Sequence, residues 1–164
     1  MTKTSKSRAR RPSVEDIALE RALEGLFRLG ANRRFDARQS VAVGAVVTRA
    51  GYAVLRSLSD LGATSLREVA DACTMDGAAA SRQVMALVDE GLVLRRTADG
   101  DARAVELSLT DLGREVYERI VTYRLRHLAN VLDEWSDEDR AVLARLVGRL
   151  TADLAVTPVP RSSD

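Results

Sequence analysis

Apolar residues recur at helical spacing through the first part of the chain, which predicts two helices there. Ser13 is placed to cap the first helix, which should run to about residue 32 or somewhat beyond. Its apolar stripe consists of Ile17, Leu19, Leu23, Leu26 and Phe27. Residues 33–46 have a mixed pattern that decides no structure. Thr48 then caps a second helix, and Gly62 ends it.

Two more helices are predicted by their start signals. Ser65 and Glu68 form a capping box at the start of a short third helix. Asp76 is a good N-cap for a fourth helix that extends to about Glu90. At 3.6 residues per turn, its inner stripe is Ala80, Val84, Leu87 and Val88. Its outer face then carries Ala78, Ala79, Arg82, Met85 and Ala86, with Ser81 and Gln83 on the flanks.

The pattern changes from helical to alternating after Gly91. Residues 92–97 predict one strand, residues 98–102 a turn, and residues 105–109 a second strand, which together form a β-hairpin. Thr110 and Ser136 then cap two long terminal helices. The expected fold is mainly α with a small β-wing. It has a winged helix-turn-helix lobe at about 48–113 and dimerisation helices at about 13–35 and 111–155.

Composition and charge narrow the class of protein. The hydrophobic fraction of 46% is that of an ordinary globular domain, and 164 residues can form a core without a disulfide or a metal. A single cysteine excludes an intramolecular disulfide and favours the cytoplasm. Neither a signal peptide nor a membrane span is expected. Residues 1–12 are predicted to be a disordered basic arm, which either binds the DNA backbone or is solvated, and residues 156–164 a disordered tail.

Five short motifs follow one another between residues 65 and 113. They are Leu66-Arg67-Glu68-Val69-Ala70, Ser81-Arg82, Glu90-Gly91-Leu92-Val93, Asp101-Ala102-Arg103 and Leu109-Thr110-Asp111-Leu112-Gly113. In this order and spacing they resemble the winged helix-turn-helix of the MarR family, and the family layout fits about residues 13–155. The resemblance implies a homodimeric repressor of transcription that is released from DNA by a small aromatic or lipophilic effector.

The candidate DNA contacts lie on the fourth helix and on the hairpin. Helix 76–90 would enter the major groove of a pseudo-palindromic operator, and wing 97–104 the minor groove. The candidates are Ala78, Ala79, Ser81, Arg82, Gln83, Arg95, Arg96, Asp101 and Arg103. Alanines allow close approach, Arg82 suits a guanine or a phosphate, and Ser81 and Gln83 suit a phosphate or an adenine. Arg103 would enter the minor groove with its guanidinium held by Asp101, while Arg95 and Arg96 would reach phosphates.

The same residues bear on other classes of function. Acidic side chains offset the arginines between residues 65 and 96, so a dimer that acts through protein contacts is the alternative. No nucleophile elbow, P-loop or metal-ligand cluster is present, so neither an enzyme nor a cofactor is expected. Cys73 is expected to be a buried structural thiol, and His127 a surface or interface residue. Tyr52 with Arg33 or Arg34 is the weak candidate for an effector pocket.

Overall fold

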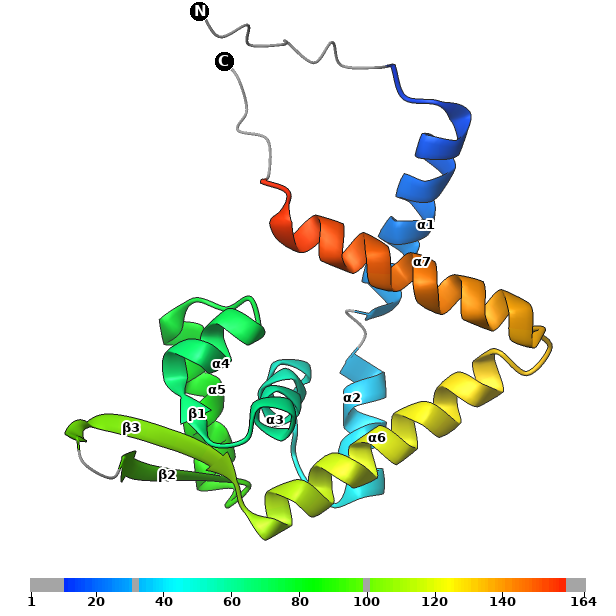
Figure 1. Ribbon diagram of the computed structural model, residues 1–164. Coiled ribbons are helices and arrows are strands. Elements are labelled where there is room, and N and C mark those ends of the chain that lie inside the picture. The colour runs from blue at the N-terminus through cyan, green and yellow to red at the C-terminus, as the bar shows by residue number, and fades with distance from the viewer. Residues whose placement is uncertain (1–10, 31–32, 99–100, 159–164) are drawn as a thin grey trace, which may run out of the picture. The chain divides into compact units, whose positions relative to one another are not determined.

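The structure is a computed structural model that describes residues 11–30, 33–98 and 101–158, with only the backbone at 33, 98 and 101–104. Its elements, in chain order, are α1 (Val14–Gly30), α2 (Arg33–Val43), α3 (Arg49–Leu61), β1 (Thr64–Ser65), α4 (Leu66–Ala72), α5 (Gly77–Asp89), β2 (Val93–Ala98), β3 (Asp101–Leu109), α6 (Asp111–Val131) and α7 (Asp137–Val156) (Figure 1). Two compact units divide the chain after residue 117. The mainly α class with a small antiparallel sheet is confirmed.

The predicted caps start the helices of the first unit. The Thr48 hydroxyl accepts a hydrogen bond from the Gly51 N–H at 2.9 Å, and the Asp76 carboxylate accepts one from the Ala79 N–H at 2.7 Å. Ser65 and Glu68 form the complete capping box, because each side chain accepts from the backbone N–H of the other residue. These bonds satisfy N–H groups that a helix leaves without partners in its first turn.

The region before residue 48 contains two helices. Helix α1 extends to Gly30, and the predicted end near residue 32 lies outside the described residues. Helix α2 occupies Arg33–Val43, where the sequence pattern was undecided. Among the described side chains of α2, at 34–43, only Gln39 and Val43 are buried. Two inward positions one turn apart are too few to produce a helical period in the sequence.

The sheet has three strands rather than the predicted two, in the order β1-β3-β2. Thr64 pairs with Leu107, and Ser65 with Glu106, in an antiparallel register. β1 is only two residues long, so it leaves no alternating pattern in the sequence. β3 also begins at Asp101, four residues before the alternation that predicted it.

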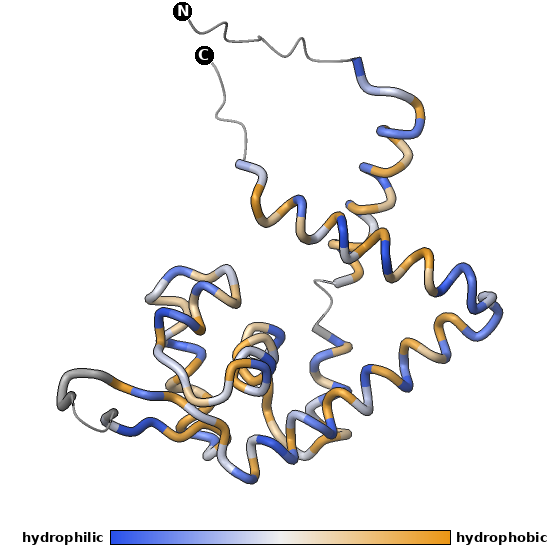
Figure 2. The backbone as a smooth tube through the Cα atoms, viewed as in Figure 1, coloured by the Kyte–Doolittle hydropathy of each residue, from blue (hydrophilic) through white to orange (hydrophobic). Residues whose placement is uncertain are grey.

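The core of the first unit lies between α3, α4, α5 and the sheet. Its largest fully buried side chains include Leu55, Leu58, Val69, Leu92 and Leu107. In Figure 2 the hydrophobic positions of α3, α4 and α5 recur along each helix, as the sequence stripes predicted. Leu61 and Leu112, which end or begin their helices, are about half exposed and lie outside this core.

The start of α6 is locked to the turn that follows α5. The Thr110 hydroxyl donates to the carbonyl of Gly91 at 2.8 Å and accepts from the N–H of Gly113 at 2.9 Å. The Thr110 N–H donates to the carbonyl of Leu92 at 3.1 Å. A Cβ on Gly113 would lie 2.9 Å from the Leu92 carbonyl carbon and closer still to its oxygen, so only glycine fits there.

The second unit contains the rest of α6 and α7. Arg140 closes the turn between them, since its Nη2 donates to the carbonyl of Leu132 at 2.6 Å and its Nε to that of Trp135 at 3.2 Å. Trp135 thus lies in the turn, not on the preceding helix as its place in the apolar stripe suggested. Within the described ranges, no helix is both long and apolar enough to cross a membrane.

Candidate nucleic-acid interface

Helix α5 has one buried and one exposed face, as the sequence predicts. Ala80, Val84 and Leu87 are buried against the core, and Val88 is half-buried. The opposite side of the helix carries exposed side chains. These are Ala78, Arg82, Met85 and Ala86, which we call the outer face of α5. A helix whose outer face combines small residues with one arginine can approach a groove closely and still donate to a base edge or a phosphate.

Ala79, Ser81 and Gln83 lie half-buried beside that face. The N–H of Ala79 is already used by the Asp76 cap. Ser81 lines a cavity of about 170 Å³ together with Arg95 and apolar side chains of α4, α5 and β3. The structure therefore brings Ser81 and Arg95 to one place, where α5 meets the wing.

Gln83 makes a contact that the sequence did not predict. Its Oε1 accepts a hydrogen bond from the Thr48 hydroxyl at 3.0 Å, across 35 residues of chain. The bond joins the cap of α3 to the middle of α5. Only the packing of α3 on α5 brings these residues together, so no local motif signals the pair.

Strand β2 of the wing places its two arginines on opposite faces. Arg95 pairs with the buried Leu107, and Arg96 with the exposed Glu106. Because successive strand residues point to opposite sides, the two guanidinium groups do not share a surface. Asp101 and Arg103 lie in β3 by their backbone, but their side chains fall outside the described residues. Their place in a minor groove stays a prediction.

The winged helix-turn-helix region is similar to known proteins. Residues 47–105, which contain α3, α4, α5, β2 and the first half of β3, match the model of the MarR family. The winged helix-turn-helix region of this chain is therefore similar to the MarR family of transcriptional regulators. The resemblance drawn from the five motifs is thereby confirmed.

One related sequence and two solved structures show the same similarity. An uncharacterised HTH-type transcriptional regulator of Bacillus subtilis, YxaD, is 28% identical over 102 residues, covering 62% of this chain and 71% of that protein. A MarR family protein from Bacillus stearothermophilus shares the fold, with a TM-score of 0.67 at 22% identity over 87% of this chain and 99% of the other. The Streptomyces coelicolor regulator PcaV, solved with its natural ligand, gives a TM-score of 0.55 at 25% identity, covering 73% of this chain and 88% of the other.

Glu68, an acidic side chain of the winged helix-turn-helix lobe, stabilises the start of α4. Glu68 accepts hydrogen bonds from the hydroxyls of Thr64 and Ser65 and from the Ser65 N–H. The Thr64 hydroxyl first, and then the Ser65 groups, lower the pKa of Glu68 from 4.5 to about 2. Its negative charge is thus fixed at the start of α4, where it favours the helix dipole.

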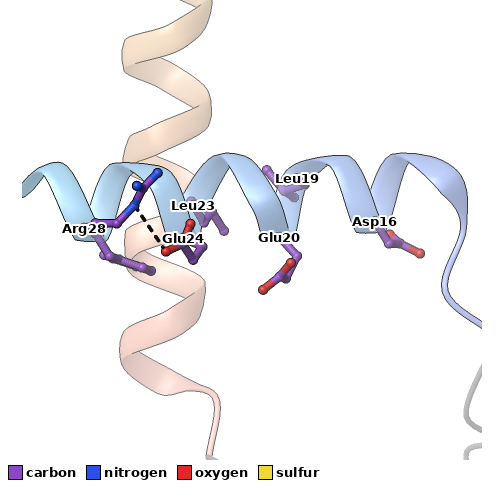
Figure 3. A pocket seen from close by; sticks show the side chains of 7 residues that line it. Asp16, Leu19, Glu20, Leu23, Glu24 and Arg28 are labelled. Atoms are coloured by element: carbon purple, nitrogen blue, oxygen red, sulfur yellow. Dashed lines mark ion pairs between the residues drawn. The ribbon is translucent and has the colours of Figure 1, made fainter.

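Helix α1 leaves most of its apolar stripe exposed in the single chain. None of its residues is buried, and Phe27 is 66% exposed. Leu19, Leu23 and Phe27 line a groove along α1, flanked by an ion pair of 3.5 Å between Glu24 and Arg28 (Figure 3). An apolar stripe of this kind is typical of a surface that another helix covers.

The second unit has an apolar groove of its own, about 480 Å³ in volume, between α6 and α7. Leucine, valine and alanine line it. The apolar lining residues are Leu125, Leu128, Ala129, Leu132, Leu143, Ala144 and Val147. Many of these side chains are about half exposed, as are Leu146 and Leu154 on α7.

The remaining sequence candidates have different outcomes. Tyr52 is half-buried and stacks on Tyr117, with ring centroids 5.9 Å apart, and burial raises the pKa of Tyr117. Arg34 is exposed, whereas the side chain of Arg33 lies outside the described residues. Cys73 is half-buried at the end of α4, so the prediction of a buried thiol was wrong. Among the described residues, no cluster of side chains could hold a metal ion.

Proposed function

We propose that this protein is a ligand-responsive homodimeric repressor that reads a pseudo-palindromic operator. Helix 76–90 would lie in the major groove and wing 97–104 in the minor groove. The observation that carries the proposal is the outer face of α5, where Arg82 is exposed among small residues on a helix whose other side is fixed in the core. Such a face suits direct contact with base edges.

The apolar surfaces of the helical parts support the homodimer. Leu26 and Phe27 of α1 and Leu146 and Leu154 of α7 are each about half or more exposed in the single chain. Soluble proteins rarely leave contiguous apolar stripes in water, and a second copy would cover them with two-fold symmetry. Two-fold symmetry also suits an operator with two half-sites one helical turn apart.

Control by a small aromatic or lipophilic effector is the second part of the proposal. It is supported by the similarity to PcaV, which was solved in complex with its natural ligand. An effector would act by favouring dimers in which the spacing of the two α5 helices no longer matches consecutive major grooves. Tyr52 remains the aromatic candidate for this site.

Selection of bound duplexes from a random library tests the DNA-reading part. A palindromic consensus is expected, together with tight, salt-sensitive binding to DNA upstream of the protein's own gene. Arg103→Ala should weaken that binding by about 1–3 kcal/mol. Recovery of no consensus, with Arg103→Ala indistinguishable from the wild type on every duplex, would refute specific reading.

A dimer that acts through protein contacts is the second candidate. The observation in its favour is the charge balance of the winged helix-turn-helix lobe, in which acids such as Asp71 and Asp89 offset Arg67 and Arg82. Arg67 and Asp71 even lie within 3.9 Å of each other. A steep fall of DNA affinity with salt concentration, which reports cations on phosphates, would eliminate this candidate.

A further inference from the structure

Thr48 joins the start of α3 to the side of α5. Its hydroxyl oxygen accepts from the Gly51 N–H at 2.9 Å, which is the ordinary role of an N-cap. The same hydroxyl donates to Oε1 of Gln83 at 3.0 Å. A hydroxyl has one proton to donate, so the Thr48 donor is committed to the carbonyl end of the Gln83 amide.

This bond decides which end of the Gln83 amide is available to DNA. A glutamine amide has an acceptor end and a donor end, and half a turn about its last bond exchanges them. With Oε1 turned towards Thr48, the two N–H groups on Nε2 are the part of the amide best placed for an outside partner. A partner bound by these N–H groups is a hydrogen-bond acceptor.

The acceptor that fits this position is a phosphate oxygen. A glutamine that reads adenine presents Oε1 and Nε2 side by side to the base edge. Here Oε1 points back towards α3, and Gln83 is half-buried on the flank of α5 rather than on its outer face. Donors of this kind contact the sugar–phosphate backbone and set the register of a helix without reading sequence.

We infer that Thr48 is a positioning residue that holds Gln83 as a donor to a DNA phosphate. The inference rests on the proposed function, because it requires α5 to lie in the major groove. It assigns Thr48 a role in DNA binding beyond its role as a helix cap. It also settles the two alternatives that the sequence left open for Gln83, phosphate or adenine, in favour of phosphate.

A double-mutant cycle between Thr48 and Gln83 tests the inference. Thr48→Gly removes the donor but leaves a nearly adequate N-cap, and Thr48→Ser keeps both functions. Affinity is measured by fluorescence anisotropy on a duplex selected by the wild type and on a scrambled duplex. Thr48→Gly and Gln83→Ala should each weaken both duplexes by about 2- to 10-fold, the loss expected for one hydrogen bond. Thr48→Ser should restore binding, and the double variant should bind no worse than Gln83→Ala alone.

Two variants guard against effects on folding. Ser136→Gly removes the cap hydroxyl of α7, which bonds Asp139, and should leave DNA affinity unchanged. Affinities in the cycle are measured at a temperature at which every variant is folded, and Thr48→Ser and Ser136→Gly then act as the two controls for cap effects. Because the Gln83 amide is neutral, none of the Gln83 variants should change the salt dependence of binding.

The outcomes separate this inference from the proposed function. Additive losses in the cycle would mean that Thr48 acts only as a cap. A Gln83→Ala variant that relaxes discrimination at one base pair, yet binds the scrambled duplex normally, would mean that Gln83 reads a base. Either result overturns the inference while specific binding stands. If the wild type binds all duplexes without preference, the proposed recognition of an operator is overturned. The effect of Thr48 on affinity can then still be measured on the scrambled duplex. A wild type that binds neither duplex would overturn both.

Discussion

Replacing Gly113 with alanine should destabilise the protein far more than an exchange of one hydrogen for a methyl group suggests. The new Cβ would meet the backbone of Leu92, with its carbonyl carbon at 2.9 Å and its Cα at 3.3 Å. The nearest atoms belong to backbone, so no side-chain rotation relieves the overlap. The start of α6 or the turn after α5 must move instead.

The expected loss of stability follows from two destabilising contributions and one stabilising contribution. Overpacking against a rigid neighbour costs about 1–3 kcal/mol. A shift would also weaken the hydrogen bonds of Thr110 to Gly91 and Leu92, each of which contributes about 0.5–1.5 kcal/mol. Alanine offsets roughly 1 kcal/mol through its helix propensity. The net loss is about 2–4 kcal/mol, which lowers the Tm of a chain of this size by about 4–16 °C.

Thermal and urea unfolding at one fixed protein concentration measure this loss, since a dimer links stability to concentration. Gly77→Ala is the matched control, because a Cβ there meets nothing within 4 Å, and it should be as stable as the wild type or more stable by up to about 1 kcal/mol through helix propensity. If Gly113→Ala is as stable as this control, the start of α6 can shift at little cost in free energy. The contacts between α6 and the turn after α5 would then not constrain the fold.

Three further predictions concern charge, DNA and assembly. Glu68→Gln should destabilise the protein at pH 7. The folded-state pKa of about 2 lies below the ordinary 4.5, so the stability difference between wild type and Glu68→Gln should shrink as the pH falls from 4.5 towards 2. A Tm difference that stays constant over this pH range would contradict the prediction. Arg82→Ala should weaken operator binding by about 1–3 kcal/mol with little change in Tm, as titration by anisotropy would show, and unchanged affinity would remove Arg82 from the interface. Leu146→Glu should convert a dimer into a monomer in light scattering, and a dimer that persists would exclude this face of α7 from the interface.

The sequence predicted those parts of the fold that local chemistry controls. Thr48, Ser65, Asp76 and Ser136 each accept a backbone N–H within three residues, so the start of each helix is encoded in one short segment. The inner stripe of α5 was equally predictable, because its period of 3.6 residues extends over three turns.

Features that depend on residues far apart along the chain could not be predicted from local sequence patterns. β1 exists because Thr64 and Ser65 meet Leu107 and Glu106, more than 40 residues later in the chain. The Thr48–Gln83 bond likewise depends on how α3 packs against α5. Helix α2 has a different cause: its two buried residues, Gln39 and Val43, include a polar one, which obscures the period.

Helix α5 is held at three points, and each tie has a different partner. Asp76 fixes its first turn, Thr48 holds Gln83 at its middle, and Thr110 secures Gly91 just beyond its end. None of the three places a charge on the outer face of the helix. A substitution that loosens a tie should therefore weaken binding to the operator while leaving the salt dependence intact, because the number of cations on phosphates stays the same. Loss of Arg82, by contrast, should also reduce the salt dependence if its partner is a phosphate. The dependence of DNA affinity on salt concentration thus distinguishes residues that position α5 from residues that contact DNA through charge.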